Sequence, residues 1–273
     1  MIIDGHAHVG GEYSDLPSII KTLDDAGIDK VVLCPADKKR SSPLIIPGIA
    51  GKFAGDELNF QINKFLRTAT AGRSTSNYIY RGNAAMADLV KKSGGRVIQF
   101  HWTDPLREGI INELETRYES QGFKGIKLHQ CIHHFKILSD EFRQVAEFAS
   151  SHDMPVFIHL YSKDDIADFI SVAGNYNTNF ITGHLIGIDT FISEKDRVSD
   201  NVYFDISCPP LVPPEKVMKA IDVFGPGRLV MGSDTPYGRH NPQKAVSFVR
   251  SLFVSSKQKD MILGENLRNL LRL

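Results

Sequence analysis

The first residues in the sequence with a chemically suggestive spacing are two histidines near its start. Residues 1–5 are mostly apolar and lead directly into His6, Ala7 and His8. In an extended strand alternate side chains share a face, so His6 and His8 are expected to point the same way. Two imidazoles on one face can bind a single divalent metal ion. The pair alone is also compatible with an ordinary surface position, so the rest of the chain must decide.

Three further titratable residues stand late in apolar runs that read as buried strands: His159, His184 and Asp234. Each has a simpler interpretation, because a histidine at a strand end is more often a hydrogen-bonded polar residue than a ligand. Asp234 could equally be a turn residue. Their joint occurrence at the same level of several strands favours a metal site. Nitrogen and oxygen donors suit zinc first and other first-row divalent ions next.

A second layer of polar residues lies on the run that contains Lys127 and His129. The alternation of this run predicts that both side chains face the interior. A buried lysine is costly unless it meets an anion, so Lys127 is a candidate to bind a substrate carboxylate. Two alternatives are a carboxylated lysine that bridges two metals and a lysine that emerges into solvent at the rim. Trp102 and Tyr161, at or just after strand ends, are candidates to line the pocket or belong to the core.

The cluster of Cys131, His133 and His134 resembles a metal-binding group on paper. It follows a strand and has no partner at matching spacing, so we expect an exposed loop or residues on the substrate side. Asp205 alternates with apolar neighbours on another run, which predicts an inward side chain with a structural hydrogen-bonding role.

The elements that must position these residues form a repeating pattern. Helical patterns with apolar residues three and four apart separate eight short apolar, β-branched runs. Alternating strands and helices indicate a parallel sheet, and eight units in 273 residues predict a closed (β/α)8 barrel. An open doubly wound sheet is the alternative, but the first turn lacks the GxGxxG spacing. The predicted strands are 2–8, 28–35, 96–103, 122–129, 155–160, 179–185, 201–207 and 228–234.

One connection is much longer than the others. Residues 37–95 follow the second predicted strand, where a barrel loop is normally a few residues long. We predict an irregular loop over 37–55 and helices over 57–71 and 83–92. Because this insertion leaves from the end of the barrel that carries active sites, we expect it to be a lid or a dimer contact.

Composition limits the other classes of function. The chain is 42% hydrophobic and 23% charged, as in globular proteins, which is consistent with one barrel domain over 1–273. Lys plus Arg and Asp plus Glu both number 32, which argues against a nucleic-acid or membrane-surface partner. Three scattered cysteines do not suggest a disulfide framework, and no apolar run reaches the length of a membrane span. A reducing cytoplasm is the expected location.

At these residues the chain resembles the amidohydrolase superfamily, and specifically its amidohydrolase-related branch. That branch includes aminocarboxymuconate-semialdehyde decarboxylase, resorcylate decarboxylases and lactone hydrolases. The resemblance covers nearly the whole chain. It rests on these segments: 3–8 (IDGHAH), 123–129 (FKGIKLH), 155–159 (PVFIH), 183–184 (GH), 231–236 (MGSDTP) and 262–267 (ILGENL).

The resemblance implies a (β/α)8 barrel with one catalytic divalent metal, zinc or alternatively manganese. The ligands it implies are His6, His8, His159 and Asp234. His184 would be the acid/base residue, or a further ligand if a second metal binds, which would also recruit Lys127. Gln130 stands where family members often have proline, and residues 37–76 do not map onto a member of known substrate.

Two enzyme functions and one non-enzymatic function follow. The first is a metal-dependent hydrolase that activates water to attack an ester, lactone or amide carbonyl of a small, carboxylate-bearing substrate. The alternative is a metal-dependent, non-oxidative decarboxylase of a small unsaturated or aromatic acid. In both, His184 and Asp234 would be catalytic, and Lys127, His129, Trp102 and Tyr161 would bind substrate. The third is a non-catalytic barrel that binds a ligand. A homodimer is compatible with the insertion.

Overall fold

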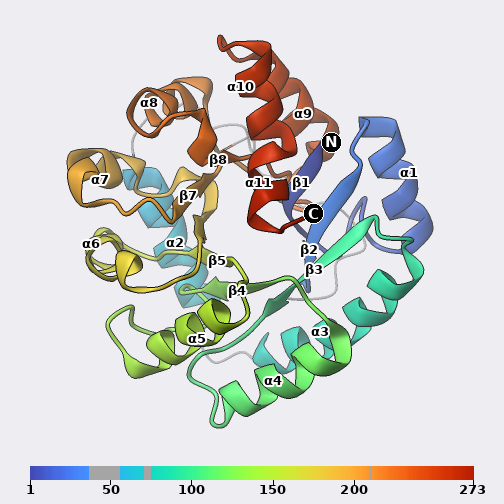
Figure 1. Ribbon diagram of the computed structural model, residues 1–273, viewed down its shortest axis with the longest axis vertical. Coiled ribbons are helices and arrows are strands. Elements are labelled where there is room, and N and C mark those ends of the chain that lie inside the picture. The colour runs from blue at the N-terminus through green and yellow to red at the C-terminus, as the bar shows by residue number, and fades with distance from the viewer. Residues whose placement is uncertain (37–55, 71–74, 209–210) are drawn as a thin grey trace.

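Eight parallel strands form one sheet in sequence order, each paired with the next along the chain. The computed structural model describes residues 1–36, 56–70, 75–208 and 211–273. The strands surround a common axis inside a ring of helices (Figure 1). They are β1 (Ile3–His8), β2 (Lys30–Cys34), β3 (Val97–Trp102), β4 (Gly125–His129), β5 (Val156–His159), β6 (Phe180–Thr182), β7 (Val202–Asp205) and β8 (Leu229–Val230).

The main chain closes the barrel between β1 and the segment that follows β8. Gly5 N donates to Met231 O at 2.9 Å, Asp234 N to His6 O at 2.8 Å, and His8 N to Thr235 O at 2.7 Å. A glycine is needed at position 5, because a Cβ there would lie 2.7 Å from Met231 O. We call this junction the β1–β8 seam. It places His6 and Asp234 on adjacent stretches of backbone.

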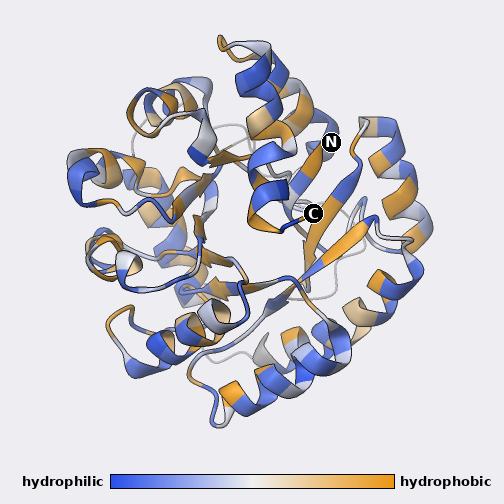
Figure 2. Ribbon diagram, in the orientation of Figure 1, coloured by the Kyte–Doolittle hydropathy of each residue, from blue (hydrophilic) through white to orange (hydrophobic). Residues whose placement is uncertain are grey.

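Helices connect the strands and cover the barrel. α5 begins where the hydroxyl of Ser139 accepts a hydrogen bond from Phe142 N, and its buried face carries Phe142, Val145 and Ala149. Figure 2 shows largely apolar strands and hydrophilic outer helix faces. The helices are α1 (Leu16–Ala26), α2 (Glu57–Thr70), α3 (Thr75–Lys92), α4 (Ile110–Gln121), α5 (Asp140–Ser151), α6 (Lys163–Val172), α7 (Ile188–Ser193), α8 (Pro214–Phe224), α9 (Asn241–Ser251), α10 (Ser256–Asp260) and α11 (Asn266–Leu270).

The predicted barrel and its eight strands are confirmed, with shorter strands at β6 and β8. The prediction carried β6 to residue 185. The strand ends at Thr182 because His184 and Leu185 adopt left-handed φ angles of 58° and 49°, which cannot continue a strand.

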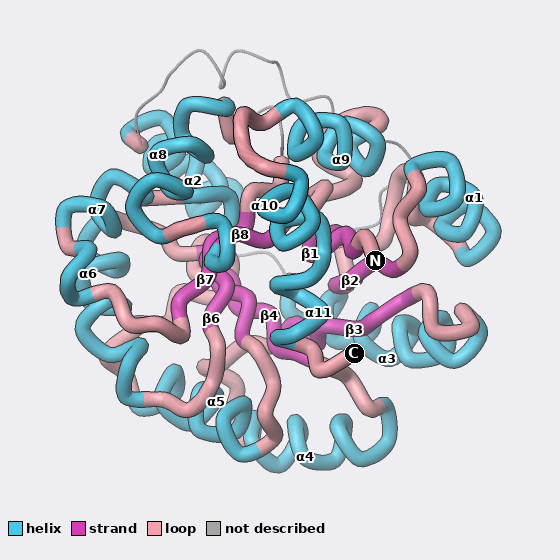
Figure 3. The backbone as a smooth tube through the Cα atoms, turned by 45° about the horizontal axis from the view of Figure 1, so that its top comes forward, coloured by secondary structure: helices cyan, strands magenta, loops and turns pink. Residues whose placement is uncertain are grey.

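The insertion after β2 supplies α2 and α3, and its predicted loop over 37–55 lies outside the described residues. The helix predicted over 83–92 begins earlier, at Thr75. α11 packs beside β1 and β8, whereas α2 contacts the backbone that follows β5 (Figures 1 and 3). In the part of the chain that the structure describes, no helix has the length and apolar character needed to cross a bilayer. The role of the insertion as lid or dimer contact stays a prediction.

Candidate metal centre

Aromatic or imidazole side chains end four of the strands at one end of the barrel. His8 ends β1, Trp102 ends β3, His129 ends β4 and His159 ends β5. Because all strands are parallel, these residues gather at the carboxyl end of the sheet, where barrel active sites are built. We call this end the mouth.

Three of the predicted site residues, His6, His184 and Asp234, bring their donor atoms within 4.8 Å of one another. His6 Nε2 lies 3.4 Å and His8 Nε2 lies 3.8 Å from Asp234 Oδ1. All four side chains are buried, with exposed fractions of 7% or less. The structure therefore brings together three of the four predicted ligands and the predicted acid/base residue.

Backbone conformation aims two of these side chains at the mouth. His184 has φ 58° and Asp234 has φ 55°, in the left-handed region that non-glycine residues seldom adopt. Each follows the end of its strand, β6 or β8. Such conformations are costly and concentrate at functional sites.

A hydrogen bond to a carbonyl fixes which nitrogen His8 presents. His8 Nδ1 lies 2.9 Å from Pro35 O, and a carbonyl oxygen can only accept, so Nδ1 carries the proton. Nε2, which faces Asp234, then keeps its lone pair. This arrangement is typical of metal-ligating histidines, whose second nitrogen donates to a backbone carbonyl or carboxylate.

His184 is oriented by Ser207 and Asp205. The Ser207 hydroxyl donates to Asp205 Oδ2, so its oxygen accepts from His184 Nδ1 at 2.9 Å. Asp205 Oδ2 also accepts the His184 backbone N–H at 2.9 Å. Nε2 of His184 is thereby left as an acceptor. Asp205 has the structural role predicted for it, and Ser207 is a positioning residue that sequence reasoning did not assign.

His159 is bound by a residue of the insertion, Asn63 of α2. His159 Nε2 lies 2.9 Å from Asn63 Oδ1, and Asn63 Nδ2 donates to the carbonyls of Leu160 at 3.0 Å and Tyr161 at 2.8 Å. Asn63 is 1% exposed. The sequence did hold one signal: an asparagine at a helix position that the apolar pattern would otherwise fill. Nothing in it linked that position to β5.

Burial shapes the electrostatics of the donor group. It raises the pKa of Asp234 well above its usual value and lowers the pKa of His6 well below its usual value. Burial also lowers the pKa of His184 to about 3. His6 and His184 are therefore neutral at physiological pH and present lone pairs, and the charged form of Asp234 is disfavoured as long as no cation compensates it.

Lys127 supplies a positive charge to this group. Its Nζ lies 3.3 Å from His6 Nε2 and 3.9 Å from the centre of the Phe157 ring, and the residue is 1% exposed. Burial lowers its pKa to about 8, which leaves the ammonium form prevalent at neutral pH. The prediction that Lys127 faces the interior is confirmed, and the alternative of a solvent-exposed lysine is wrong.

These residues fit a divalent metal ion. Imidazole lone pairs and a carboxylate converge in a buried volume, and the bare group already attracts the Lys127 ammonium. Buried charge and unsatisfied lone pairs are costly without a cation, and N/O donor sets suit zinc or manganese. His6, His8, His159 and Asp234 stay the predicted ligand set. His159 faces the same mouth, with its ring centre 5.2 Å from that of His184.

The predicted substrate-binding residues form one wall of the mouth. Trp102 stacks on His129 with ring centres 5.8 Å apart, and His129 stacks on His159 at 4.0 Å. Tyr161 follows β5 and lies under the guanidinium of Arg67, 4.4 Å from its ring centre. These stacked contacts hold the rings of the wall against one another.

A second set of potential donors, His129, Cys131 and His159, also lies within 4.8 Å. The two imidazole planes are 10° apart and stacked, so their in-plane lone pairs run parallel and do not converge on one ion. We assign no metal to this set. The expected exposed loop is wrong for Cys131 and His133, which are buried.

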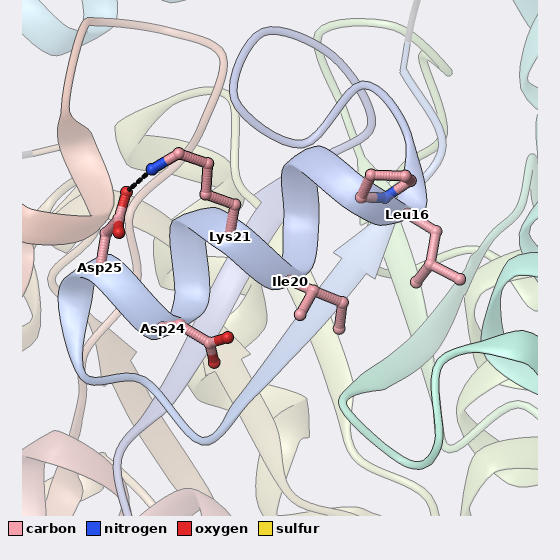
Figure 4. A pocket seen from close by; sticks show the side chains of 6 residues that line it. Leu16, Ile20, Lys21, Asp24 and Asp25 are labelled. Atoms are coloured by element: carbon pink, nitrogen blue, oxygen red, sulfur yellow. Dashed lines mark hydrogen bonds and ion pairs between the residues drawn. The ribbon is translucent and has the colours of Figure 1, made fainter.

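A hollow of about 600 Å³ beside α1 is unrelated to the mouth (Figure 4). It is lined by residues 16, 17, 20, 21, 24 and 25, all on one helix. Its charged groups are already paired, Lys21 with Asp25 at 2.5 Å and Asp24 with Arg96 at 2.8 Å. It therefore presents no convergent chemistry.

Comparisons with known proteins place this arrangement in a family. The sequence profile described as Amidohydrolase matches residues 67–273, so the chain belongs to the amidohydrolase family and to its metal-dependent enzymes. The match includes Lys127, His159, His184 and Asp234, and begins after His6 and His8. Among curated proteins no sequence matches this chain.

Solved structures share the fold at low sequence identity. A 5-carboxyvanillate decarboxylase from Sphingomonas paucimobilis aligns with TM-score 0.70 and 13% identity over 100% of this chain and 99% of its own. A probable 2-pyrone-4,6-dicarboxylic acid hydrolase from Acinetobacter baumannii, with citric acid bound, aligns with TM-score 0.69 and 15% identity over 100% of this chain and 99% of its own. A dihydroxybenzoic acid decarboxylase from Polaromonas sp. JS666, with bound manganese and the inhibitor 2-nitroresorcinol, aligns with TM-score 0.68 and 15% identity over 100% of this chain and 97% of its own.

Proposed function

We propose that this protein is a metal-dependent, non-oxidative decarboxylase of a small aromatic or unsaturated carboxylic acid. The observation that carries the proposal is the buried ammonium of Lys127 beside the His6–Asp234 donor group and the aromatic wall of the mouth. An ammonium in that position would attract a carboxylate, and the aromatic side chains of the mouth would contact a planar ring. Hydrolysis was the first expectation from sequence. Decarboxylases among similar structures favour the alternative.

The metal would be held by His6, His8, His159 and Asp234. When bound, it supplies Lewis-acid stabilisation of negative charge on substrate oxygens. We propose zinc from the donor set, with manganese, which a similar decarboxylase structure contains, as the second choice.

In the proposed reaction a proton is added to the ring carbon that bears the carboxylate. The bond from that carbon to the carboxylate then breaks, its electron pair returns to the ring, and CO2 leaves. Asp234, whose Oδ1 lies 3.4 Å from His6 Nε2 in the donor group, would carry this proton to the ring carbon. His184, held by Ser207, presents Nε2 as an acceptor for a substrate hydroxyl. Lys127 fixes the carboxylate until the bond breaks.

Hydrolysis of a lactone is the second candidate. The same donor group could orient a water molecule, and the fold is shared with a probable pyrone-dicarboxylic acid hydrolase. The products separate the two functions, since hydrolysis retains every carbon of the substrate and decarboxylation releases CO2.

The test uses protein reconstituted separately with zinc and manganese and supplied with 2,6-dihydroxybenzoate, 5-carboxyvanillate or a pyrone lactone. The expected result is one CO2 released per acid consumed, with turnover reduced about 10²–10⁴-fold in Asp234→Asn because the proton carrier is lost. Circular dichroism should show an unchanged fold in that variant. A lactone product that retains all carbons would instead establish the hydrolase. Full activity in Asp234→Asn would contradict the assigned role.

A further inference from the structure

The insertion helix α2 reaches the candidate metal centre through a buried polar face. Asp56, immediately before the helix, and Asn59 and Asn63 within it are at most 8% exposed. Helices normally bury apolar residues at such positions, and α2 instead leaves Phe65 71% exposed. Its buried side is therefore adapted to polar partners.

The hydrogen bonds of Asn63 fix the orientation of its amide. Both contacts of Nδ2, at 3.0 Å and 2.8 Å, are to backbone carbonyls, those of Leu160 and Tyr161. Carbonyls only accept, so the NH2 group must face them and Oδ1 must face His159. The reverse orientation would oppose oxygen to oxygen at two contacts.

This orientation determines the tautomer of His159. Asn63 Oδ1 can only accept, and it lies 2.9 Å from His159 Nε2, so Nε2 carries the proton. The lone pair of the neutral ring is then on Nδ1. His8 is the reverse case, because its Nδ1 donates to Pro35 O and its Nε2 faces Asp234.

We infer that Asn63 is a positioning residue that holds His159 as the Nε2–H tautomer, so that the insertion fixes Nδ1 as the ligating atom on the β5 side of the metal centre. This inference rests on the proposed function. It assigns part of the insertion a role in the site itself, besides any role as a lid or dimer contact. Partners of this kind orient metal-bound histidines and raise their affinity for metal.

Two substitutions at Asn63 separate positioning from packing. Asn63→Leu has a similar volume and removes the acceptor and both donors. Asn63→Asp keeps an acceptor oxygen toward His159 and loses the two donors, so it should lower thermal stability while preserving the tautomer. The matched control is Asn83→Leu in α3. Asn83 is also buried and bonds only main chain, Trp102 N at 3.1 Å and Trp102 O at 2.8 Å, through its side chain.

The first measurement is the dissociation constant of Mn²⁺ for the metal-free, full-length protein, determined by competition with a chelator. Asn63→Leu should weaken binding about 10–100-fold, as loss of a histidine's hydrogen-bond partner does elsewhere. Asn63→Asp and Asn83→Leu should bind as the wild type does. Wild-type affinity in Asn63→Leu, or equal losses in Asn63→Leu and Asn63→Asp, would overturn the positioning role.

The second measurement reads the tautomer directly in the wild type, so it does not require any variant at Asn63 to fold. Long-range ¹H–¹⁵N spectra of metal-free protein labelled at histidine, assigned with His159→Gln, should show a protonated Nε2 on His159. A protonated Nδ1 would overturn the inference. If the wild type binds no metal, the proposed function fails and the tautomer still tests the role of Asn63. If it binds metal and releases CO2 with Nδ1 protonated in the apo form, only the inference fails.

Discussion

The two sides of the mouth are built in different ways. On the β1–β8 side, main-chain hydrogen bonds across the seam place His6 beside Asp234, and Gly5 permits the close approach. On the β5 side, a side chain from an inserted helix, Asn63, holds His159. The seam is part of the barrel itself, whereas the β5 side depends on a segment that the barrel does not need for closure.

Because of this difference, the two sides of the mouth should respond differently to substitutions that leave the barrel folded. Main-chain geometry is shared by all eight strands and is lost only when the barrel unfolds. The contact with α2 depends on how well the insertion is anchored. Its anchor is the buried pair of Asp56 and Lys216 of α8, whose charged atoms are 2.8 Å apart, and Asp56 Oδ2 also accepts Asp189 N–H at 2.9 Å.

The largest expected effect comes from breaking that anchor. Asp56→Ala leaves the ammonium of Lys216, which is 4% exposed, without its partner. Removing one member of a buried pair typically costs about 3–5 kcal/mol, so urea unfolding should show a loss of that size. Metal affinity should also fall, because α2 carries Asn63.

The double variant Asp56→Leu/Lys216→Met controls for the buried charge. Apolar replacement of a buried pair is often nearly neutral, so it should regain much of the lost stability. Asp189→Ala is the control for an exposed ion pair. It removes the partner of Lys219, whose Nζ lies 3.6 Å from Asp189 Oδ1, and should lower the free energy of unfolding by less than about 1 kcal/mol. An Asp56→Ala protein as stable as the wild type would mean that α2 is held by other contacts.

A smaller effect is expected on the other side of the mouth, at the seam. In Gly5→Ala the new methyl group would lie 2.7 Å from both Met231 O and Val230 Cγ1, so the backbone must shift. Overpacking of this kind costs about 1–3 kcal/mol, measured by denaturant unfolding. The shift should also displace His6 and weaken metal binding.

Gly227→Ala is the matched control for the seam, because its new Cβ would meet only the end of the flexible Met261 side chain, at 3.3 Å. If both alanine variants lost equal stability, close approach at the seam would not be the reason that position 5 is glycine.

The same contrast explains what the sequence could predict. The barrel follows from local patterns, since eight apolar runs alternate with helical periods, and strand ends of a parallel barrel must meet. His6, His8, His159 and Asp234 could therefore be placed at one mouth from their positions in those runs. Asn63 could not, because its role depends on how an insertion folds back over β5, which no local periodicity encodes. Ser207, which follows β7, contacts His184, which follows β6, and it was missed for the same reason: no local periodicity encodes that contact.

The smallest expected effect concerns the acid sensitivity of stability, and it compares a histidine of the barrel wall, His101, with the histidines of the mouth. His101 of β3 packs on Phe123 with ring centres 4.7 Å apart, and burial, with a smaller contribution from Arg117, lowers its pKa from 6.5 to about 3. Between pH 6.5 and 3 the unfolded chain binds a proton at His101 that the folded chain does not. The free energy of unfolding therefore decreases by about 1.4 kcal/mol for each unit by which the pH is lowered in that range. In His101→Leu this contribution disappears. Urea unfolding of metal-loaded protein at pH 6.5 and 5 should therefore show a shallower acid loss in the variant. An identical loss in both proteins would contradict the assigned contribution of His101 to the acid sensitivity.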